Sequence, residues 1–305
     1  MRFDTFPAFS KKQMKFVVSP RWFLDATLKG VSQIMLQENR WTGVLFLIGL
    51  CTGNWIFGLA ALVASAVGAG TALVARFPEK EIDSGLYGFS AALVGVALVF
   101  LFKTTFLLWV LLVVGSVAAA LLQGFFLRRK IPVYTLPFIL ITWALVFVIR
   151  ETGLLPPSVF SQTIFSPSAY PYLFAATNGF GEVIFQDGVW AGCLFFLGVL
   201  ISNPVAAGYA LLASAIGAGV AFGTGAEAGD IQMGLFGFNA VLTAIVFAGP
   251  TWKAALWTLL GVATTLFLHL IFVKMDWFAL IGGPFTFPFV LGTWITLFFR
   301  KKRRF

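Results

Sequence analysis

The sequence is poor in charge. Only 11% of its 305 residues are Asp, Glu, Lys or Arg, whereas 59% are hydrophobic, and the mean hydropathy is +0.93. An average soluble domain carries about 25% charged residues. A soluble protein of this length exposes a large surface, which 21 basic and 12 acidic residues cannot cover. The composition therefore excludes a soluble enzyme, and it also excludes a disordered chain, which would be poor in apolar residues.

The sequence also lacks the residues of a metal centre or a catalytic site. Its two cysteines, Cys51 and Cys193, lie inside apolar runs, where we expect buried free thiols. Its single histidine, His269, has no second histidine or carboxylate three or four residues away, which favours a paired or interfacial imidazole over a proton relay. No nucleophile motif or nucleotide-binding loop is present. We therefore expect no enzyme, no metal and no cofactor.

No Lys or Arg lies between Glu151 and Trp252, although the net charge is +9. Seven basic residues lie within residues 1–40, and five form the cluster 300–304. Positively charged flanks of apolar segments stay on the cytoplasmic side of a membrane. The charge therefore predicts that both termini are cytoplasmic, and its distribution does not indicate nucleic-acid binding.

The apolar residues form ten segments, several of which reach the roughly 20 residues that a helix needs to cross the hydrocarbon core. The segments are 41–58, 59–75, 85–102, 105–127, 132–149, 189–202, 204–222, 234–250, 252–274 and 284–299. With a cytoplasmic N-terminus, the loops around 152–188 and 223–233, which lack Lys and Arg, fall outside. The sequence predicts an all-α, ten-span protein of the cell (inner) membrane.

The two halves of the sequence share four motifs in the same order. The pairs are Trp41-Thr-Gly43 and Trp190-Ala-Gly192, residues 64–70 and 213–219, residues 85–93 and 234–242, and Thr135-Leu-Pro-Phe138 and Thr286-Phe-Pro-Phe289. Each half holds five segments, and an odd number makes the second copy enter the membrane from the opposite side. We therefore expect two inverted-topology five-helix repeats. They are residues 23–150 and 173–299, with an extracytoplasmic linker (151–172) and cytoplasmic segments at 1–22 and 300–305.

Each half begins with an apolar stretch that is too short to cross a membrane, at 24–37 and 173–186. Such stretches are typical of half-membrane re-entrant pore helices, which need protein or water around them. A surface amphipathic helix is the alternative. Gln33 and Glu182, at the same repeat position, favour the pore helix. An ionisable group at membrane depth, such as Glu182, is by default a functional-site hypothesis, and a structural ion pair is its alternative.

Taken together, these motifs resemble the urea transporter family over about residues 25–299. The resemblance rests on Gln33 and Glu182, the two Gly-Leu-aromatic-Gly-Phe-x-Ala-x-Leu elements and the two Thr-x-Pro-Phe elements. It implies a homotrimer in a lipid bilayer, with a separate pore in each protomer that carries urea passively. In that family the matching positions form two apolar slots, beside polar groups that bind the N–H groups of urea.

The expected site residues follow from the resemblance and from helical spacing. Phe89 and Leu93 are four residues apart and share a helix face, as do Phe238 and Leu242. With Leu36 and Phe185 they would form the two apolar slots, beside Gln33 and Glu182. The differences between Leu36 and Phe185, and between Gln33 and Glu182, predict two sites of different affinity, with anions disfavoured at Glu182.

Two threonines are expected at the midpoint of the pore. Urea is flat, neutral and rich in N–H donors, so a pore must replace its hydrogen bonds to water. Pro137 and Pro288 would begin or break a helix and free carbonyl groups. The hydroxyls of Thr135 and Thr286 would then face each other at a constriction. Helix capping by the same hydroxyls is the alternative.

Three other functions remain open from the sequence. A channel for short amides, ammonia or water would use the same kind of path, although the paired Asn-Pro-Ala boxes and the twin histidines of known water and ammonium channels are absent. A secondary transporter could couple to protons through Glu182, and a structural scaffold would show no flux.

Overall fold

The computed structural model describes residues 19–159 and 174–302, which are helical and contain no β-strand. The expected N-terminal segment (1–22), linker (151–172) and C-terminal tail (300–305) lie in part outside these residues. In the first half the helices are α1 (Pro20–Ser32), η1 (Gln33–Met35), α2 (Arg40–Gly53), α3 (Trp55–Val74), α4 (Glu79–Asp83), α5 (Phe89–Leu101), α6 (Phe106–Arg128) and α7 (Leu136–Thr152).

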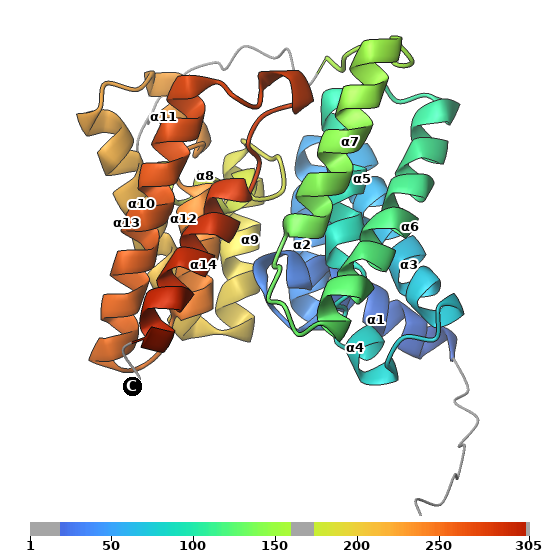
Figure 1. Ribbon diagram of the computed structural model, residues 1–305, viewed down its shortest axis with the longest axis horizontal. Coiled ribbons are helices and arrows are strands. Elements are labelled where there is room, and N and C mark those ends of the chain that lie inside the picture. Colours follow the sequence, from blue (N-terminus) through green and yellow to red (C-terminus); the bar gives the residue numbers. More distant parts are fainter. Residues whose placement is uncertain (1–18, 160–173, 303–305) are drawn as a thin grey trace, which may run out of the picture.

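The second half repeats this order of helices. It contains α8 (Ala175–Glu182), α9 (Val189–Ser202), α10 (Pro204–Gly223), α11 (Ala228–Met233), α12 (Phe238–Phe247), α13 (Trp252–Met275), η3 (Ala279–Ile281) and α14 (Phe287–Lys302). The halves lie side by side, coloured blue to green and yellow to red in Figure 1. Helices α1 and α4 lie toward one end of the molecule, whereas α8 and α11 lie toward the other (Figure 1).

Side-chain caps fix where the long helices begin. Asn54 accepts a hydrogen bond from the backbone at the start of α3, and Asn203 does so for α10. Thr105 and Thr251 cap α6 and α13 in the same way. These side chains satisfy N–H groups that a helix leaves unpaired at its first turn. The caps thus repeat between the halves, as the helices do.

Two of the expected segments, 85–102 and 234–250, are shorter as helices, because α5 begins at Phe89 and α12 at Phe238. Gly85 and Gly234 have positive φ angles (79° and 88°) and turn the chain after α4 and α11. A Cβ atom on either glycine would lie 2.4 Å from a backbone nitrogen, that of Gly30 in α1 or Gly179 in α8. The repeated motif therefore begins as a turn, on which the short helix that opens each half packs closely.

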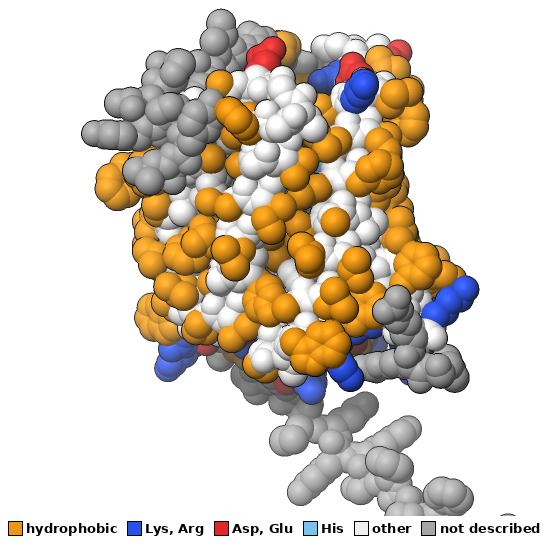
Figure 2. All heavy atoms as spheres, turned by 90° about the vertical axis from the view of Figure 1, so that its left-hand side faces the viewer, with side chains coloured by type: hydrophobic (Ala, Val, Ile, Leu, Met, Phe, Trp, Pro, Cys, Tyr) orange, Lys and Arg blue, Asp and Glu red, His pale blue; other side chains and the backbone are white. Residues whose placement is uncertain are grey.

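The surface is that of a membrane protein. Five stretches of the described chain are long and apolar enough to cross a membrane: Trp55–Val74, Phe106–Arg128, Pro204–Gly223, Ala228–Phe247 (containing α11 and α12) and Trp252–Met275. Hydrophobic side chains cover the middle of the face in Figure 2, and charged side chains gather at its two ends. The expectation of two buried thiols was wrong, because Cys51 is exposed and Cys193 is half-buried. An apolar run in such a protein can face lipid as well as the interior.

Reciprocal contacts join the two halves. The indole Nε1 of Trp143 in α7 donates to the carbonyl oxygen of Gly283 (2.9 Å). The indole of Trp294, the matching residue of α14, donates to the carbonyl oxygen of Pro132 (2.7 Å), which matches Gly283. Contacts in which i meets j and j meets i are the mark of a two-fold relation.

Helices α2 and α9 make a second reciprocal contact. A Cβ on Gly49 would meet the ring of Phe195, and a Cβ on Gly198 would meet the ring of Phe46, which matches Phe195. The two rings pack edge to face at 5.2 Å. Because the later residue of one helix meets the earlier residue of the other, α2 and α9 run antiparallel. Glycine in both helices lets each phenyl ring lie directly on the opposite backbone.

Candidate functional site

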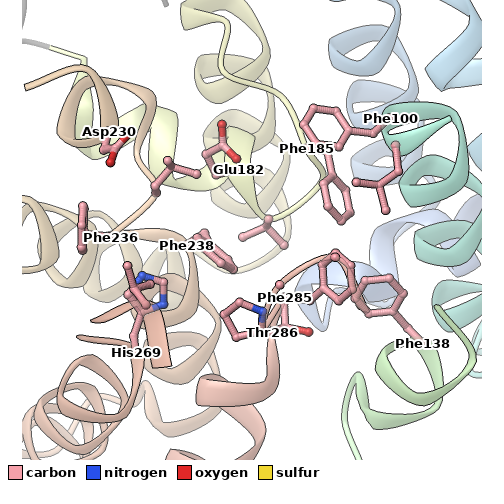
Figure 3. A pocket seen from close by; sticks show the side chains of 17 residues that line it. Phe100, Phe138, Glu182, Phe185, Asp230, Phe236, Phe238, His269, Phe285 and Thr286 are labelled. Atoms are coloured by element: carbon pink, nitrogen blue, oxygen red, sulfur yellow. The ribbon is translucent and has the colours of Figure 1, made fainter. Parts of the chain in front are cut away.

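A cavity of about 240 Å³ lies in the second half, against residues of α5 and α7 of the first. Its labelled lining residues in Figure 3 are Phe100, Phe138, Glu182, Phe185, Asp230, Phe236, Phe238, His269, Phe285 and Thr286. The wall is thus largely aromatic, with few polar groups. Glu182 lies on one side of the cavity and Thr286 on the other (Figure 3). Apolar walls with a few placed polar groups are typical of small-molecule sites.

Four of the ten expected site residues line this cavity: Glu182, Phe185, Phe238 and Thr286. A fifth, Leu242, lies one turn after Phe238 in α12 and is completely buried. The cavity therefore gathers the polar and aromatic residues that the second repeat was expected to contribute.

Glu182 is the last residue of α8. Within the described ranges, no side chain donates a hydrogen bond to its carboxylate, and the ion pairs found there involve other residues. The structural ion pair considered from the sequence is therefore absent from this part of the chain. The carboxylate oxygens are acceptors that face the cavity without a donor from the described residues, so they could accept hydrogen bonds from a solute rich in N–H groups.

The expected residues of the first half, Gln33, Leu36, Phe89 and Leu93, occupy the equivalent places. Gln33 is in η1, its amide Nε2 donating to the carbonyl oxygen of Ser84 (2.9 Å). Leu36 follows η1, and Phe89 and Leu93 are buried in the first two turns of α5. The bond to Ser84 orients the Gln33 amide and uses one of its two N–H donors.

The backbone after each short helix has the same unusual conformation. Leu36 (φ 58°) and Phe185 (φ 59°) both lie in the left-handed region. Tyr134 (φ 49°) and Phe285 (φ 46°), each preceding a midpoint threonine, form a second such pair. For bulky residues this conformation costs about 1–3 kcal/mol and is concentrated at functional sites. Its occurrence at matched positions indicates that both halves hold the same strained turns.

The ring of Phe185 packs against rings that were not among the expected site residues. Its centroid lies 5.3 Å from that of Phe100 and 5.9 Å from that of Phe285. Phe138 packs against Phe285 at 5.6 Å. Phe238 lines the cavity nearer to His269 (Figure 3). Phe100 and Phe285 lie outside the motifs used for the expectation, so sequence spacing could not identify them.

Thr135 and Thr286 meet at the boundary between the halves. Their hydroxyl oxygens lie 2.7 Å apart, and both residues are buried. The side chain of Thr135 does not cap α7, so the capping alternative fails there. Two oxygen atoms in contact leave no space between them, and a solute at this level must pass beside the pair or separate it.

Asn239 was not identified from the sequence, although it stands where the first motif has Ser90. Its Nδ2 donates to Nδ1 of His269 (3.1 Å) and to the carbonyl oxygen of Phe285 (3.3 Å). Its Oδ1 accepts from the backbone N–H of Phe289 (3.1 Å). Asn239 therefore holds the strained turn that carries Thr286, and all of its amide hydrogens are used.

His269 is a paired imidazole, as its sequence context favoured. It accepts from Asn239 and lies between the rings of Phe236 and Phe238, whose centroids are 5.5 and 5.6 Å away. It also lines the cavity, as does the carboxylate of Asp230 in α11. Asp230 could have been identified from the repeat in the sequence, because an acidic residue, Glu81, occupies the matching position of the first half.

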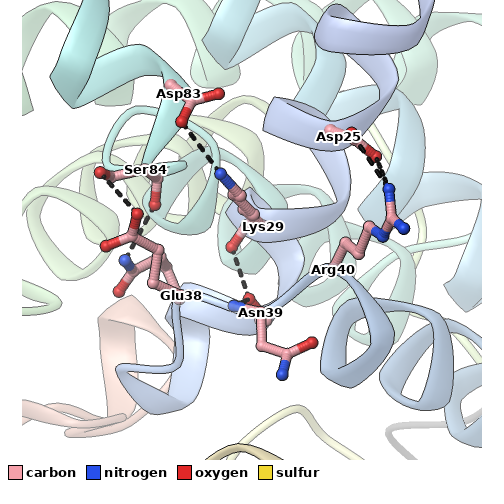
Figure 4. A network of polar contacts seen from close by, with 9 residues as sticks. Asp25, Lys29, Glu38, Asn39, Arg40, Asp83 and Ser84 are labelled. Carbon is pink, nitrogen blue, oxygen red and sulfur yellow. Dashed lines mark hydrogen bonds and ion pairs between the residues drawn. The ribbon is translucent and has the colours of Figure 1, made fainter.

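The same level of the first half is a network of charged contacts (Figure 4). Lys29 pairs with Asp83 at 3.0 Å. The hydroxyl of Ser84 donates to Glu38 (3.0 Å), beside the bond from Gln33 to the Ser84 carbonyl. The first half therefore fixes η1 and α4 with charge, whereas Glu182 in the second half is left without such partners.

The chain is similar in sequence to known proteins over most of its length. The profile of the urea transporter family matches residues 24–301. The chain is 30% identical to urea transporter 1 of Ovis aries and to that of Capra hircus, over 92% of the chain and 78% of each relative. It is also 30% identical to urea transporter 1 of Rattus norvegicus, over 80% of the chain and 68% of that protein. The resemblance seen in the motifs is confirmed, and the chain belongs to the urea transporter family.

Proposed function

We propose that this chain carries urea passively across a membrane, through a pore that includes the cavity between Glu182 and Thr286. The observation that carries the proposal is the unpaired Glu182 carboxylate, which faces an aromatic cavity in a member of the urea transporter family. A narrow apolar path selects by shape, and the acceptors along it replace the water that a solute loses.

The chemistry of the lining suits urea. Its planar face can lie against the rings of Phe185 and Phe238, and its N–H groups can be received by Glu182 and then by Thr286. Each donor left without a partner in a dry site costs about 1–3 kcal/mol. A neutral solute also avoids the large cost of burying a charge. The carboxylate disfavours anions by repulsion.

The second part of the proposal concerns topology. We infer two inverted-topology repeats of five spans, each with a half-membrane pore helix, α1 in the first and α8 in the second. The antiparallel contact of α2 with α9 and the reciprocal bonds of Trp143 and Trp294 support this arrangement. Such repeats place a permeation site near the bilayer midplane, where the Thr135–Thr286 contact would lie.

The first repeat then supplies the other half of the pore. Gln33 with Leu36, Phe89 and Leu93 is the counterpart of Glu182 with Phe185, Phe238 and Leu242. We propose that these residues form a second urea site, of different affinity because its acceptor is a neutral amide. Both termini would be cytoplasmic in the cell (inner) membrane, and the protein would be a homotrimer with one pore in each protomer.

Stopped-flow light scattering of proteoliposomes tests the proposal. We expect rapid urea flux, slow glycerol flux, equal rates in both directions and no effect of a proton or sodium gradient. The control is liposomes of the same lipid without protein. Urea accumulation under a pH gradient would replace the passive mechanism by the proton-coupled alternative. Equal flux of urea, short amides, ammonia and water would show a less selective channel. The absence of any flux would favour the structural scaffold.

A further inference from the structure

A second hollow shares no lining residue with the urea cavity. It lies where α13 begins and α14 ends. It has a volume of about 450 Å³ and is lined by Trp252, Lys253, Trp257 and Arg300, with Thr251, Ala254 and Leu256. It opens on the outer surface, and Trp252 is 72% exposed. Nothing in the proposed transport mechanism uses these residues.

The hollow carries two positive charges, Lys253 and Arg300, for which the described residues supply no carboxylate partner. In the first half, Lys29 and Arg40 are each paired with an aspartate. Among the residues that the structure describes, neither Lys253 nor Arg300 forms an ion pair. The sequence explains this, because it has no Asp or Glu between Asp230 and Asp276 and none after Asp276. An anion in the hollow would therefore meet no Asp or Glu of α13 or α14.

An apolar groove continues from the hollow along the outside of the protein. It has a volume of about 290 Å³, shares Trp257 with the hollow, and is lined by Leu260, Thr264, Ile295, Thr296 and Phe299 of α13 and α14. Thr264 lies eleven residues after Lys253 on one helix, which is about 16 Å at the rise of an α-helix. Half of a hydrocarbon core is about 15 Å thick. The hollow and the groove together are thus about as long as one leaflet is deep.

Tryptophan side chains mark the level at which the hollow would sit in a bilayer. Trp252 and Trp257 belong to the residue type that gathers at membrane–water interfaces. In Figure 2 the hydrophobic side of the molecule that includes α13 ends in basic side chains at its lower edge. A negative headgroup at this level is attracted by Lys and Arg beside the membrane. The hollow and the groove together therefore match a lipid with an anionic head and an acyl tail.

We propose that this composite site binds one anionic phospholipid, with its phosphate between Lys253 and Arg300 and one acyl chain in the groove between α13 and α14. A two-fold contact with a second copy is a poorer occupant, because the same face would bring the same two unpaired cations. The inference goes beyond urea transport, and it holds for whichever leaflet this end of the molecule meets.

Native mass spectrometry of delipidated protein, titrated in detergent with phosphatidylglycerol or phosphatidylcholine, tests the proposal. We expect the first phosphatidylglycerol to bind more tightly than the first phosphatidylcholine. The double variant Lys253→Gln/Arg300→Gln should weaken that binding about 20-fold, since each basic group near a lipid surface is worth roughly a factor of five. Phosphatidylcholine binding should change less than three-fold.

The matched control is Lys301→Gln/Lys302→Gln, which removes the same charge from neighbouring residues outside the hollow. It should change phosphatidylglycerol binding less than three-fold. Equal losses in the two double variants would mean diffuse attraction and would overturn the site, as would no loss in either. A change of oligomeric mass in the Lys253/Arg300 variant alone would assign this face to contacts between copies instead.

A third variant tests the groove separately. Thr264→Phe places a ring in the part of the groove that lies farthest along α13 from Lys253, while Leu260 and the basic residues stay in place. Both lipids should bind several-fold more weakly, with the preference for phosphatidylglycerol retained. Unchanged binding of both lipids would show that no acyl chain lies there. Urea flux of all three variants should stay within two-fold of the parent protein, which separates this inference from the transport proposal.

Discussion

The two halves share one backbone and differ in how they hold their short helices. In the first half, Lys29 and Asp83 form an ion pair. At the matching positions of the second half, Asn178 donates through Nδ2 to the carbonyl oxygen of Gln232 (2.7 Å). A basic residue at position 178 would be a cation close to Glu182, on the same helix. The neutral pair holds the short helix against α11 without placing a cation beside Glu182.

The halves differ again at the middle of the repeated motif. The hydroxyl of Ser90, buried in α5, has no hydrogen-bond partner among the described residues. Asn239, its counterpart in α12, makes three hydrogen bonds and fixes the turn before α14. Equivalent positions of a duplicated fold can thus differ in what they require. Position 90 accepts a hydroxyl without a partner, whereas position 239 holds an amide that makes three hydrogen bonds. Four predictions sharpen this comparison.

The largest effect is expected at Glu182. Glu182→Leu keeps the volume but removes the acceptors, so urea N–H groups would enter the cavity unpaired at a cost of about 1–3 kcal/mol. Urea flux per folded protein should fall about ten-fold or more. Glu182→Gln keeps one acceptor oxygen and should retain a substantial part of the flux.

The control for charge is Asp187→Asn, which removes an exposed acidic group five residues later. Its flux should match that of the parent protein. If Glu182→Leu transports as fast as the parent, Glu182 has no binding role, and the contrast with Gln33 loses its functional meaning.

The midpoint threonines should give the next largest effect. Thr135→Val or Thr286→Val removes one hydroxyl and leaves the other buried without its partner. Flux should fall several-fold, at about 0.5–1.5 kcal/mol for each lost hydrogen bond, and the double variant should be slower still. The melting temperature should follow a different order. Each single variant should melt lower than the parent, because one buried hydroxyl loses its partner. The double variant should melt no lower than the single variants, because it leaves no hydroxyl unpaired.

Flux and melting temperature measured on the same preparations separate the two effects. A stable double variant with full flux would remove these threonines from the pore. A double variant that melts much lower than either single would show that the pair holds the halves together more than it meets the solute.

Replacing Asn239 by serine, the residue at the matching position of the first half, should lower the stability of the protein. Asn239→Ser leaves the carbonyl of Phe285 and the N–H of Phe289 without their partners, at about 1–3 kcal/mol. For a protein of this size the melting temperature should drop by roughly 5 °C. Flux should fall as well, because Thr286 lies between these two residues.

Ser90→Ala is the matched change in the first half, and it removes a hydroxyl that has no partner there. Its melting temperature should be unchanged or slightly higher, since replacing an unpaired buried polar group is close to neutral. Equal losses in the two variants would contradict the difference between the halves.

The smallest effect is expected where the first half is converted to the pattern of the second. Lys29→Asn/Asp83→Gln replaces an ion pair whose side chains are partly exposed. Such pairs are worth about 0–1 kcal/mol, so the melting temperature should fall by at most a few degrees. The difference should shrink in high salt. A loss as large as that of Asn239→Ser would mean that the charged network holds α1 as firmly as Asn239 holds α14.

Much of the fold was predictable from local sequence. The repeated motifs located the helices, because glycines, prolines and caps act within a few residues. The equivalence of Gln33 and Glu182 followed from an unchanged spacing. The boundaries of α5 and α12 were wrong by about four residues, because an apolar window does not register that Gly85 and Gly234 turn the backbone.

The rest of the site depends on contacts that no local pattern contains. Asn239 and His269 are 30 residues apart, and their bond exists because α12 packs on α13. The ring of Phe185 meets Phe100 and Phe285 from two other elements. Exposure is equally hidden, since Cys51 faces outward from an apolar helix. Sequence spacing identifies residues on one face of an element, and packing decides which faces meet.

The contact between Thr135 and Thr286 has a consequence for how the protein is made. The two residues are 151 positions apart. At a synthesis rate of about 5–20 residues per second, the second threonine leaves the ribosome about 8–30 s after the first. The bond from Trp294 to Pro132 closes after a similar delay. Throughout that interval the first half must reside in the membrane with the Pro132 carbonyl and the Thr135 hydroxyl unpaired. The middle of the path is therefore completed last, and a chain that stops before residue 286 leaves it open.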